Sequence, residues 1–193
     1  GIGTIGGSAT IDDVAIHSNS ASIGGGVHTS ATTVMSRSLV SDNTATSGGG
    51  VAIAGGSFDL DRSTIRTNKA ANPSAASAEG GGIYQVGGTL SIDASTNSAN
   101  RAESTTGHPH GGGLYQGAGA GPATVTSSTF DGNHAAGTYG SGGGNVFAVG
   151  TLHARYTTLS DGHAAFGGGA LAEGYDVRFM ASAFDNLNQD CAG

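Results

Sequence analysis

The sequence predicts an all-β protein, a right-handed parallel β-helix of about seven coils with three short strands in each coil. Three observations support this fold class. Glycine pairs followed by an apolar residue recur every 24 to 32 residues. Two further apolar columns recur in step with that motif, and an asparagine column follows the last of them. Strands this short cannot bury a face alone, but stacked coils share one continuous core.

The first column is the apolar residue that follows each glycine pair. Its members are Ile2, Val27, Val51, Ile83, Leu114, Val146 and Leu171. Glycine at the preceding corner allows a positive φ without the strain that a Cβ atom would cause. The column therefore predicts one inward-facing strand at the same place in every coil.

The second column is a pair of inward residues separated by one polar residue, the period of two that marks a strand. Coil three shows it as Phe58-Asp59-Leu60 and coil four as Leu90-Ser91-Ile92. The remaining pairs are Ala9/Ile11, Thr33/Met35, Ala123/Val125, Leu152/Ala154 and Val177/Phe179. This column predicts a second strand in each coil.

The third apolar column contains one polar member, Asn97. The column reads Ile16, Val40, Ile65, Asn97, Phe130, Leu159 and Phe184. Asn97 is either an inward polar residue paired with its neighbours or a sign that the register is shifted by one at that point. The column predicts the third strand of each coil.

An asparagine column follows three residues later, and an alanine column two residues after that. The first consists of Asn19, Asn43, Asn68, Asn100 and Asn133, then Gly162 and Leu187. The second consists of Ala21, Ala45, Ala70, Ala102, Ala135 and Ala164, then Gln189. Asparagine tolerates the left-handed conformation, and stacked amides form hydrogen-bonded ladders. We therefore expect an asparagine ladder at a corner of the helix.

The composition excludes several function classes. Glycine accounts for 37 of the 193 residues, and the net charge is −7 with only 7 Lys and Arg residues. A nucleic-acid binder needs a basic stripe that this sequence does not show. No apolar run approaches 18 residues, so no membrane-spanning segment is expected. The sequence contains no cofactor motif and no metal-ligand cluster, and its single cysteine, Cys191, forms no internal disulfide.

Residues 1–193 are expected to form a single β-helix domain. Because the sequence opens in the middle of a repeat, we interpret it as a segment of a longer or self-stacking protein. Open ends of a β-helix expose strand edges, which favours head-to-tail association or continuation of the same helix. Cys191 could then form an intermolecular cross-link in an oxidising compartment.

The repeat resembles that of the polymorphic outer-membrane proteins, which pairs a Gly-Gly-Ala-Ile-type motif with a Phe-x-x-Asn-type motif. The first motif is present as Gly81-Gly82-Ile83, Gly112-Gly113-Leu114 and Gly168-Gly169-Ala170-Leu171. The second is present as Phe130-Asp131-Gly132-Asn133, Ile65-Arg66-Thr67-Asn68, Val40-Ser41-Asp42-Asn43 and Ile16-His17-Ser18-Asn19. The C-terminal Asn188-Gln189-Asp190-Cys191-Ala192-Gly193 is similar to the end of the repeat region in choice-of-anchor-type secreted bacterial proteins. The resemblance implies export and display at the outer cell surface, in a structural or adhesin-like role or as a filament subunit.

The coils differ most at one corner, between the alanine column and the next glycine pair. The inserted segments are 71–79, 103–110 and 136–141, and insertions at one corner of successive coils stack on one face. That face carries the candidate binding residues Glu79, Glu103, His108, His110 and Tyr139. A glycan or another cell-surface ligand is the expected partner. The simpler interpretation is sequence drift in tolerant surface loops.

Histidines at this corner have a structural interpretation too. His108 and His110 could supply two metal ligands, but no second pair stands at a recognisable spacing, so solvated loop histidines are favoured. His134 and His163 follow the asparagine column in consecutive coils and should stack about 4.8 Å apart. Their column also holds Lys69 and Arg101, which indicates a polar outer ladder.

The alternative function is a carbohydrate-active domain that binds or cleaves a polysaccharide, as pectate-lyase-like proteins do. Asp59 and Asp61 could share a face, and Asp93 falls in the column of Asp61 one coil later. Glycoside hydrolysis uses two such carboxylates about 5–10 Å apart. Arg62 stands beside Asp61, so a salt bridge is the simpler interpretation of that pair.

Overall fold

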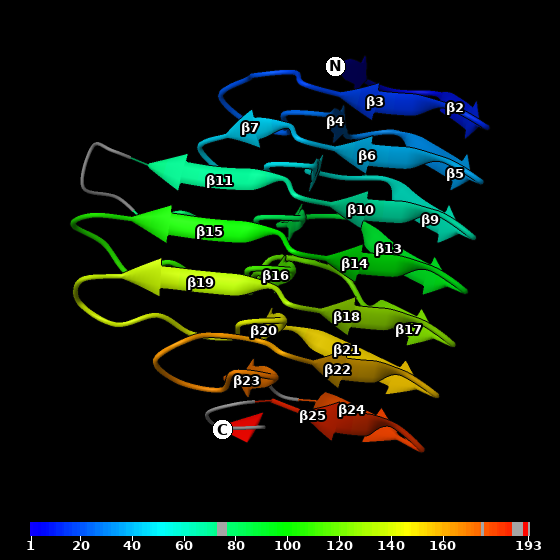
Figure 1. Cartoon of the computed structure of the whole chain (residues 1–193). Helices are drawn as coiled ribbons and strands as arrows, with labels where there is room; N and C mark the ends of the chain where they lie inside the picture. The colour runs from blue at the N-terminus through cyan, green and yellow to red at the C-terminus, as the bar shows by residue number, and fades with distance from the viewer. Residues whose placement is uncertain (73–76, 175, 187–190, 193) are drawn as a thin grey trace.

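The structure is a computed structural model that describes residues 1–72, 77–174, 176–186 and 191–192. These residues form 26 strands and no helix. Equivalent strands of successive coils pair in parallel and build four sheets. Figure 1 shows the coils stacked in chain order, with the two chain ends at opposite ends of the stack. The parallel β-helix predicted from the sequence is confirmed.

Three sheets run the length of the stack, and each receives one strand per coil. Sheet A consists of β1 (Ile2–Thr4), β4 (Val27–Thr29), β8 (Val51–Ile53), β12 (Ile83–Gln85), β16 (Leu114–Gln116), β20 (Val146–Ala148), β23 (Ala170–Ala172) and β26 (Cys191–Ala192). Sheet B consists of β2 (Ser8–Asp12), β5 (Thr32–Ser36), β9 (Ser57–Asp61), β13 (Thr89–Asp93), β17 (Ala123–Thr126), β21 (Thr151–Arg155) and β24 (Asp176–Met180). Sheet C consists of β3 (Ala15–His17), β6 (Leu39–Ser41), β10 (Thr64–Arg66), β14 (Thr96–Ser98), β18 (Thr129–Asp131), β22 (Thr158–Ser160) and β25 (Ala183–Asp185).

A fourth sheet, sheet D, is confined to coils two to five and was not predicted. It consists of β7 (Thr44–Ala45), β11 (Lys69–Asn72), β15 (Arg101–Ser104) and β19 (His134–Gly137). The alanine column lies within these strands, since Ala70 pairs with both Ala45 and Ala102. The expected corner loops of coils three to five therefore begin as strands.

The three apolar columns pair as the sequence predicts, with one exception in coil seven. There Val146 pairs with Ala170, whereas Leu171 pairs with Phe147 on the opposite face. The reason is a glycine with positive φ that stands three residues before the first inward residue of six sheet A strands, such as Gly143 before Val146 and Gly167 before Ala170. The position of that glycine sets the register, so the smaller alanine enters the core column.

One apolar cluster fills the interior from the first coil to the last. Phe58, Met35 and Phe130 are among its largest fully buried side chains. Burying a side chain of this size contributes about 1.5–3 kcal/mol. Asn97 also faces inward and is 2 % exposed; it accepts a hydrogen bond from Asn100 Nδ2 (2.8 Å) and donates one to the Gly113 carbonyl (3.3 Å). The register is therefore unshifted, and Asn97 is a paired polar residue.

The asparagine ladder is present and extends further than the sequence indicates. Each side-chain amide donates to the next carbonyl oxygen, from Asn19 to Asn133, at 3.0 Å per step. Where Gly162 leaves the column without a side chain, Asn145 reaches in from the sheet A corner and accepts from Asn133 Nδ2 (2.8 Å). Asn145 then donates to Asn186 (3.2 Å). Leu187 and Gln189, assigned to these columns from sequence, lie outside the described residues.

A second ladder of hydroxyl groups lies at the corner between sheets B and C. The backbone N–H of Ser38 donates to Ser63 Oγ (3.0 Å), and that of Ser63 donates to Ser95 Oγ (3.0 Å). The residue before each ladder member has a positive φ, for example Arg62 (43°). The residue that precedes most of the ladder asparagines also has a positive φ, as Asp42 (57°) before Asn43 does. The left-handed residue is thus the neighbour of the asparagine and not the asparagine itself, and the ladder bonds offset its strain of about 1–2 kcal/mol.

The strand edges at the two ends of the described stack lie beside partly buried apolar side chains. Ile2 is partly buried at one end, and Val177, Phe179 and Phe184 are partly buried at the other. β26 adds to β23 through the pair Ala170–Cys191; the side chain of Cys191 lies outside the described residues. None of the described residues forms a helix long and apolar enough to cross a membrane.

Candidate functional site

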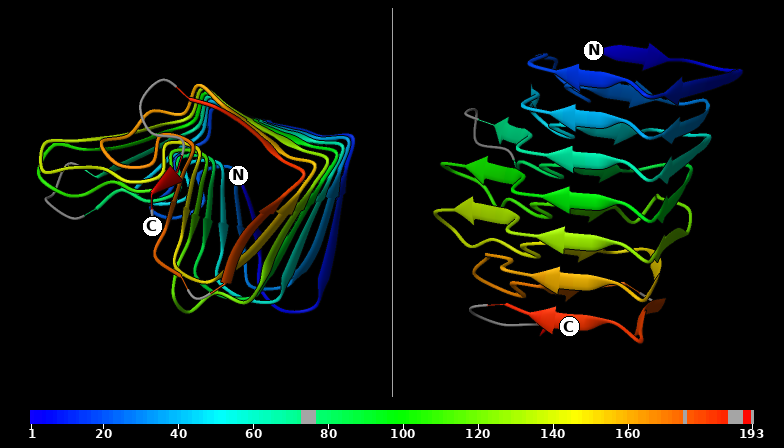
Figure 2. Two further views of the ribbon diagram at one scale, coloured as in Figure 1. Left: turned by 90° about the horizontal axis from the view of Figure 1, so that it is seen from below. Right: turned by 45° about the vertical axis from the view of Figure 1, so that its right-hand side comes forward.

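The sheet D arm projects from the otherwise even outline of the stack. We define it as β11, β15 and β19 with the segments 77–80, 105–111 and 138–143 that lead back to sheet A. Figure 2, viewed along the stack, shows these longer coils reaching well beyond coils one, two and six. Backbone bridges at the base of the arm join Ser47, Glu79, His110 and Gly142 in register. The arm is therefore an ordered extension of the coils in which successive copies align.

Small side chains allow the two sides of the arm to approach each other closely. Ala70, Ala102 and Ala78 form an apolar cluster of their own, each fully buried. Alternate residues of the strands point to the opposite face, away from this alanine interior. Close approach is also needed where the arm meets sheet A, because a Cβ atom on Gly112 would lie 2.5 Å from His134 N. Alanine and glycine thus allow the backbones of the arm and of sheet A to approach closely.

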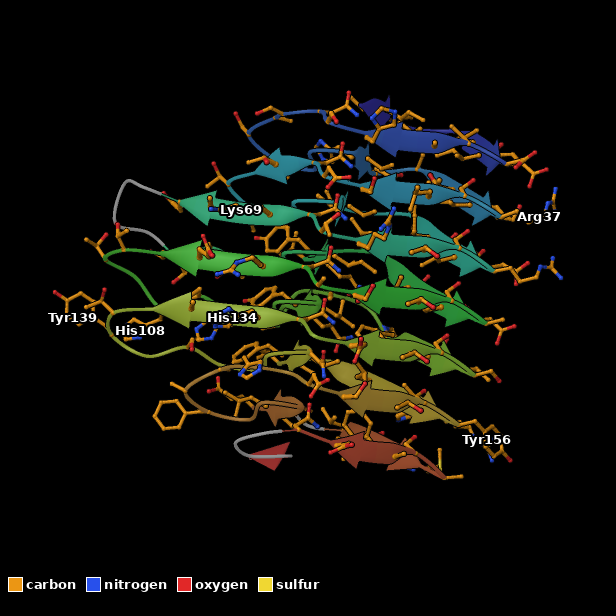
Figure 3. All side chains as sticks on the ribbon, viewed as in Figure 1. Arg37, Lys69, His108, His134, Tyr139 and Tyr156 are labelled. Atoms are coloured by element: carbon orange, nitrogen blue, oxygen red, sulfur yellow. The ribbon has the colours of Figure 1, made fainter. Side chains whose placement is uncertain are left out.

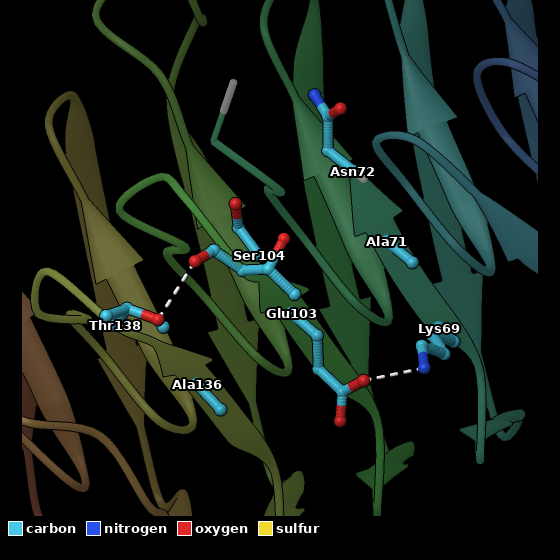
Figure 4. Close-up of a pocket in the computed structure, with 9 residues that line it drawn as sticks. Lys69, Ala71, Asn72, Glu103, Ser104, Ala136 and Thr138 are labelled. Carbon is cyan, nitrogen blue, oxygen red and sulfur yellow. Dashed lines mark hydrogen bonds and ion pairs between the residues drawn. The ribbon is translucent and has the colours of Figure 1, made fainter. Parts of the chain in front are cut away.

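The outer face of sheet D forms an open groove of about 580 Å³. It is lined by Lys69, Ala71, Asn72, Glu103, Ser104, Thr105, Ala136, Gly137 and Thr138. These come from β11, β15 and β19 and the residues that follow, so the groove crosses three coils (Figure 4). Ala71 and Ala136 add little bulk to its floor. Thr138 Oγ1 donates to the Thr105 carbonyl (2.9 Å) and ties two coils together at its side.

Glu103 is the charged residue at the centre of the groove. Its carboxylate contacts Lys69 Nζ (2.6 Å) from the coil before and Arg101 (2.5 Å) on its own strand. The hydrogen bond from Lys69 and that from Arg101 lower the pKa of Glu103 below its usual value, despite opposing desolvation. Glu103 is thus ionised at neutral pH and partly neutralises two cations. Of the five candidate binding residues predicted from the sequence, Glu103 is the one that lines the groove.

Lys69 and Arg101 belong to a column that continues with two histidines, as the sequence predicts. Lys69 pairs with Arg101, Arg101 with His134, and His134 with His163. The two imidazole rings lie 5.7 Å apart between centroids in an edge-to-face arrangement. Burial lowers the pKa of His134, and the nearby Arg101 and His163 lower it further. Figure 3 shows Lys69 and His134 on the same face of the arm.

The other four candidate binding residues lie outside the groove. His108 and Tyr139 are at the tip of the arm, with ring centroids 6.2 Å apart, and Tyr139 is 65 % exposed. Glu79 and His110 are register partners at the base of the arm. The five candidate residues therefore lie at three separate places: in the groove, at the tip of the arm and at its base.

His110, at the base of the arm, is half-buried, whereas the sequence favoured a solvated loop histidine. Its ring stacks on Phe147 with centroids 4.3 Å apart, and its buried Nδ1 has no hydrogen-bond partner. Burial, with a smaller effect from His108, lowers the pKa of His110 to about 4. Burial raises the pKa of Glu79, which shares a hydrogen bond with Tyr84. His110 is thus a packed, neutral side chain and not a solvated loop histidine.

An aromatic stack on the outer face of sheet A was missed from sequence. Tyr84, Tyr115 and Phe147 lie in successive coils with ring centroids 5.5 Å apart at each step. The repeated Gly-Gly-Ile-Tyr-Gln and Gly-Gly-Leu-Tyr-Gln segments carried the signal. Because the ring of Tyr115 has a neighbouring ring on each face, it has no free face for a sugar to stack on. The stack therefore stabilises the coils.

The candidate catalytic carboxylates lie on the outer face of sheet B. Asp61 pairs with Asp93 in the next coil, as the sequence predicts, and Asp59 pairs with Ser91. Asp61 also forms the expected salt bridge with Arg62 (2.6 Å). These carboxylates do not line the sheet D groove. No three His, Cys, Asp or Glu side chains converge as metal ligands would anywhere in the described ranges.

Comparison with known proteins returns no relative for this chain. No family model, no curated protein and no solved structure matches it significantly. The parallel β-helix therefore rests on the strand pairing described above. The resemblance to the polymorphic outer-membrane-protein repeats remains a prediction from the motifs.

Proposed function

We propose that this chain is an extracellular, adhesin-like β-solenoid that binds a glycan in the sheet D groove. The observation that carries the proposal is the groove itself, formed where the fourth strand, two residues long in coil two, lengthens to four residues in coils three to five. Three stacked strands form its floor, where Ala71 and Ala136 are small and Glu103, between them, is charged. Display at the outer cell surface is what the repeat motifs imply, and antibody labelling of intact source cells tests it.

The experiment is a glycan array probed with the chain and with two matched tryptophan variants. Ala136→Trp fills the groove from its floor. Thr124→Trp makes the same change on the exposed outer face of sheet B in the same coil. We expect Ala136→Trp to abolish binding and Thr124→Trp to leave it intact. Equal effects of the two variants, or no binding by the parent chain, would contradict the proposal.

Association end to end is proposed as the route to a filament. The outermost described strands of sheets A, B and C lie beside partly buried apolar residues such as Ile2 and Phe184, which a further coil paired at those strand edges would cover. Strand edges of this kind pair readily with further strands. Electron microscopy of the native assembly should show fibres with a layer repeat of ~4.8 Å. Discrete short particles would rule out the filament.

Glycan cleavage is the alternative, and its support is the pairing of Asp61 with Asp93 in adjacent coils. The salt bridge between Asp61 and Arg62 gives one of these carboxylates a structural partner. Release of reducing ends or unsaturated products from a glycan, lost in the Asp59→Asn/Asp61→Asn variant, would establish cleavage. Binding without product release would leave the adhesin-like function.

A further inference from the structure

We propose that the outer edge of sheet D binds a second copy of this chain, with the β19 strands of the two copies paired antiparallel across a two-fold axis. The pairing is centred near Gly137, and the tip of each arm rests against coil six of the partner. Because the same patch serves on both copies, the assembly closes as a dimer. This surface is separate from the ends of the stack, where the proposed filament contacts lie.

The outer half of β19 extends beyond coil six. β19 is the last strand of sheet D, and the backbone N–H of Ala135 donates to the His163 carbonyl of coil six (2.8 Å). Alternate residues of a strand direct their N–H and C=O groups to the same side, so those of Gly137 point the same way. Coil six pairs with coil five again at Phe166, which lies opposite Gly142. The arm between these contacts overhangs coil six, and no described strand lies beside Gly137 on that side (Figure 2).

The two edges of sheet D differ in their protection against strand pairing. Proteins shield edge strands by making them very short or by placing charged residues or proline on them. β7, at one edge, is two residues long. β19, at the other edge, has four residues, and the segment 135–142 contains neither a charged residue nor a proline. The β19 edge is therefore the one that can accept a further strand.

Charge favours a second copy of the chain as the occupant of this edge. Two copies with a net charge of −7 each repel one another, so they approach most easily where neither carries charge. The arm tip and the facing part of coil six, residues 135–142 and 164–169, are both without charged residues. The two-fold axis brings 135–142 of each copy beside 164–169 of the other. A charged peptide would find no complementary charge on either segment.

Exposed aromatic side chains lie on both parts of this surface. Tyr139, at the tip, is 65 % exposed, and Phe166, on coil six, is 56 % exposed. Figure 3 shows Tyr139 beside His108 at the far end of the arm. Phe166 lies near the same segment, since a Cβ atom on Gly140 would be 3.6 Å from its Cε2. Aromatic residues are enriched at the centres of protein interfaces, and the dimer places Tyr139 of each copy against Phe166 of the other.

The test is sedimentation equilibrium of the chain and of two matched lysine variants over a wide range of concentration. We expect the parent chain to reach twice its monomer mass of 18.6 kDa. Tyr139→Lys removes a ring and adds a charge at both symmetric contacts, so it should raise the dissociation constant of the dimer about a hundredfold. Tyr156, which is 62 % exposed at the corner between sheets B and C, supplies the control. Tyr156→Lys should leave the dimer unchanged.

Hydrogen exchange locates the contact. In the parent chain, exchange at residues 136–138 should slow as the concentration rises, and in Tyr139→Lys it should not. A chain that stays monomeric would overturn the inference, and so would equal effects of the two lysine variants. Association that Tyr139→Lys leaves unchanged would also overturn it, because the contact would then lie elsewhere, as at the ends of the stack. The glycan array tests the groove separately, so either proposal can fail alone.

Discussion

The asparagine corner and the sheet D arm are neighbours in the same coils, yet they are built in opposite ways. At the corner, one residue type repeats from coil to coil and is fully buried, as Asn68 and Asn100 are. In the arm, the residues that face outward change at each step, from Lys69 to Arg101 to His134. Both regions keep the same register. Uniform buried ladders therefore hold the stack together, and the varied outward face is available for binding.

Replacing Asn68 by alanine should reduce the stability of the stack most, because Asn68 belongs to the buried ladder. Asn68 accepts from the backbone N–H and the side chain of Asn43 and donates to the Val40 carbonyl, each at 3.0 Å. Leaving such buried groups unpaired costs about 1–3 kcal/mol each. We expect the free energy of unfolding, measured in urea, to fall by about 3 kcal/mol or more.

Thr124→Ala, an exposed change on sheet B, is the control for that measurement. It should alter the unfolding free energy by no more than about 0.5 kcal/mol. Equal effects of the Asn68 and Thr124 substitutions would mean that the ladder does not stabilise the stack.

Gly112→Ala should cause the second-largest loss of stability, because it disturbs the junction of the arm with sheet A. The added Cβ would lie 2.5 Å from backbone atoms of Gly144 and His134. Overpacking of this kind costs about 1–3 kcal/mol. Gly3→Ala is the control: no atom lies within 4 Å of its Cβ position, and its φ is not in the left-handed region. Thermal unfolding should show a clear loss for Gly112→Ala and little change for Gly3→Ala.

His110→Leu should raise stability by about 1 kcal/mol, since it removes a buried ring nitrogen that has no partner. Burial lowers the pKa of His110 to about 4, below the unfolded value of 6.5. The unfolded chain therefore binds the proton first, and the parent chain should lose stability as the pH falls from 6.5 toward 4. The loss should be smaller in His110→Leu. Urea titrations at several pH values would contradict this account if the two chains lost stability equally.

Glu103→Gln should have the smallest effect on stability, within about 1 kcal/mol, because its ion pairs are partly solvated. The pKa of Glu103 is lowered in the folded chain, so its contribution is present above pH 4.5 and is lost as the pH falls through the folded value. The parent and variant should therefore converge in acid. A large loss of stability at neutral pH would make Glu103 a structural residue.

Much of the fold follows from the sequence because the apolar period of two repeats in every coil. Phe58 and Leu60 pair with Leu90 and Ile92 as that pattern requires, and even the polar Asn97 keeps its column. Leu171 was placed wrongly because a large apolar residue looks like a core residue. The glycine with positive φ, Gly167, sets the register one residue earlier.

The candidate site was only partly predictable. The corner insertions and Glu103 stand out in the sequence, but the fourth strands do not, since the run from Lys69 to Asn72 has no apolar alternation. The contact between Lys69 and Glu103 joins residues of different coils and follows only once the register is known. Asn145 likewise joins the ladder from a different corner, to fill the place left by Gly162. Such contacts depend on which coils lie beside each other and leave no local signal.

Hydrogen exchange of the chain with and without a glycan selected on the array tests the central claim most directly. In the free chain, amides at the asparagine corner should exchange most slowly and those of the arm faster. With the glycan bound, exchange should slow at residues 69–72, 101–104 and 134–137 and stay unchanged at the corner. Protection around Asp59, Asp61 and Asp93 instead, or no change at sheet D, would contradict the assignment of the arm as the binding face.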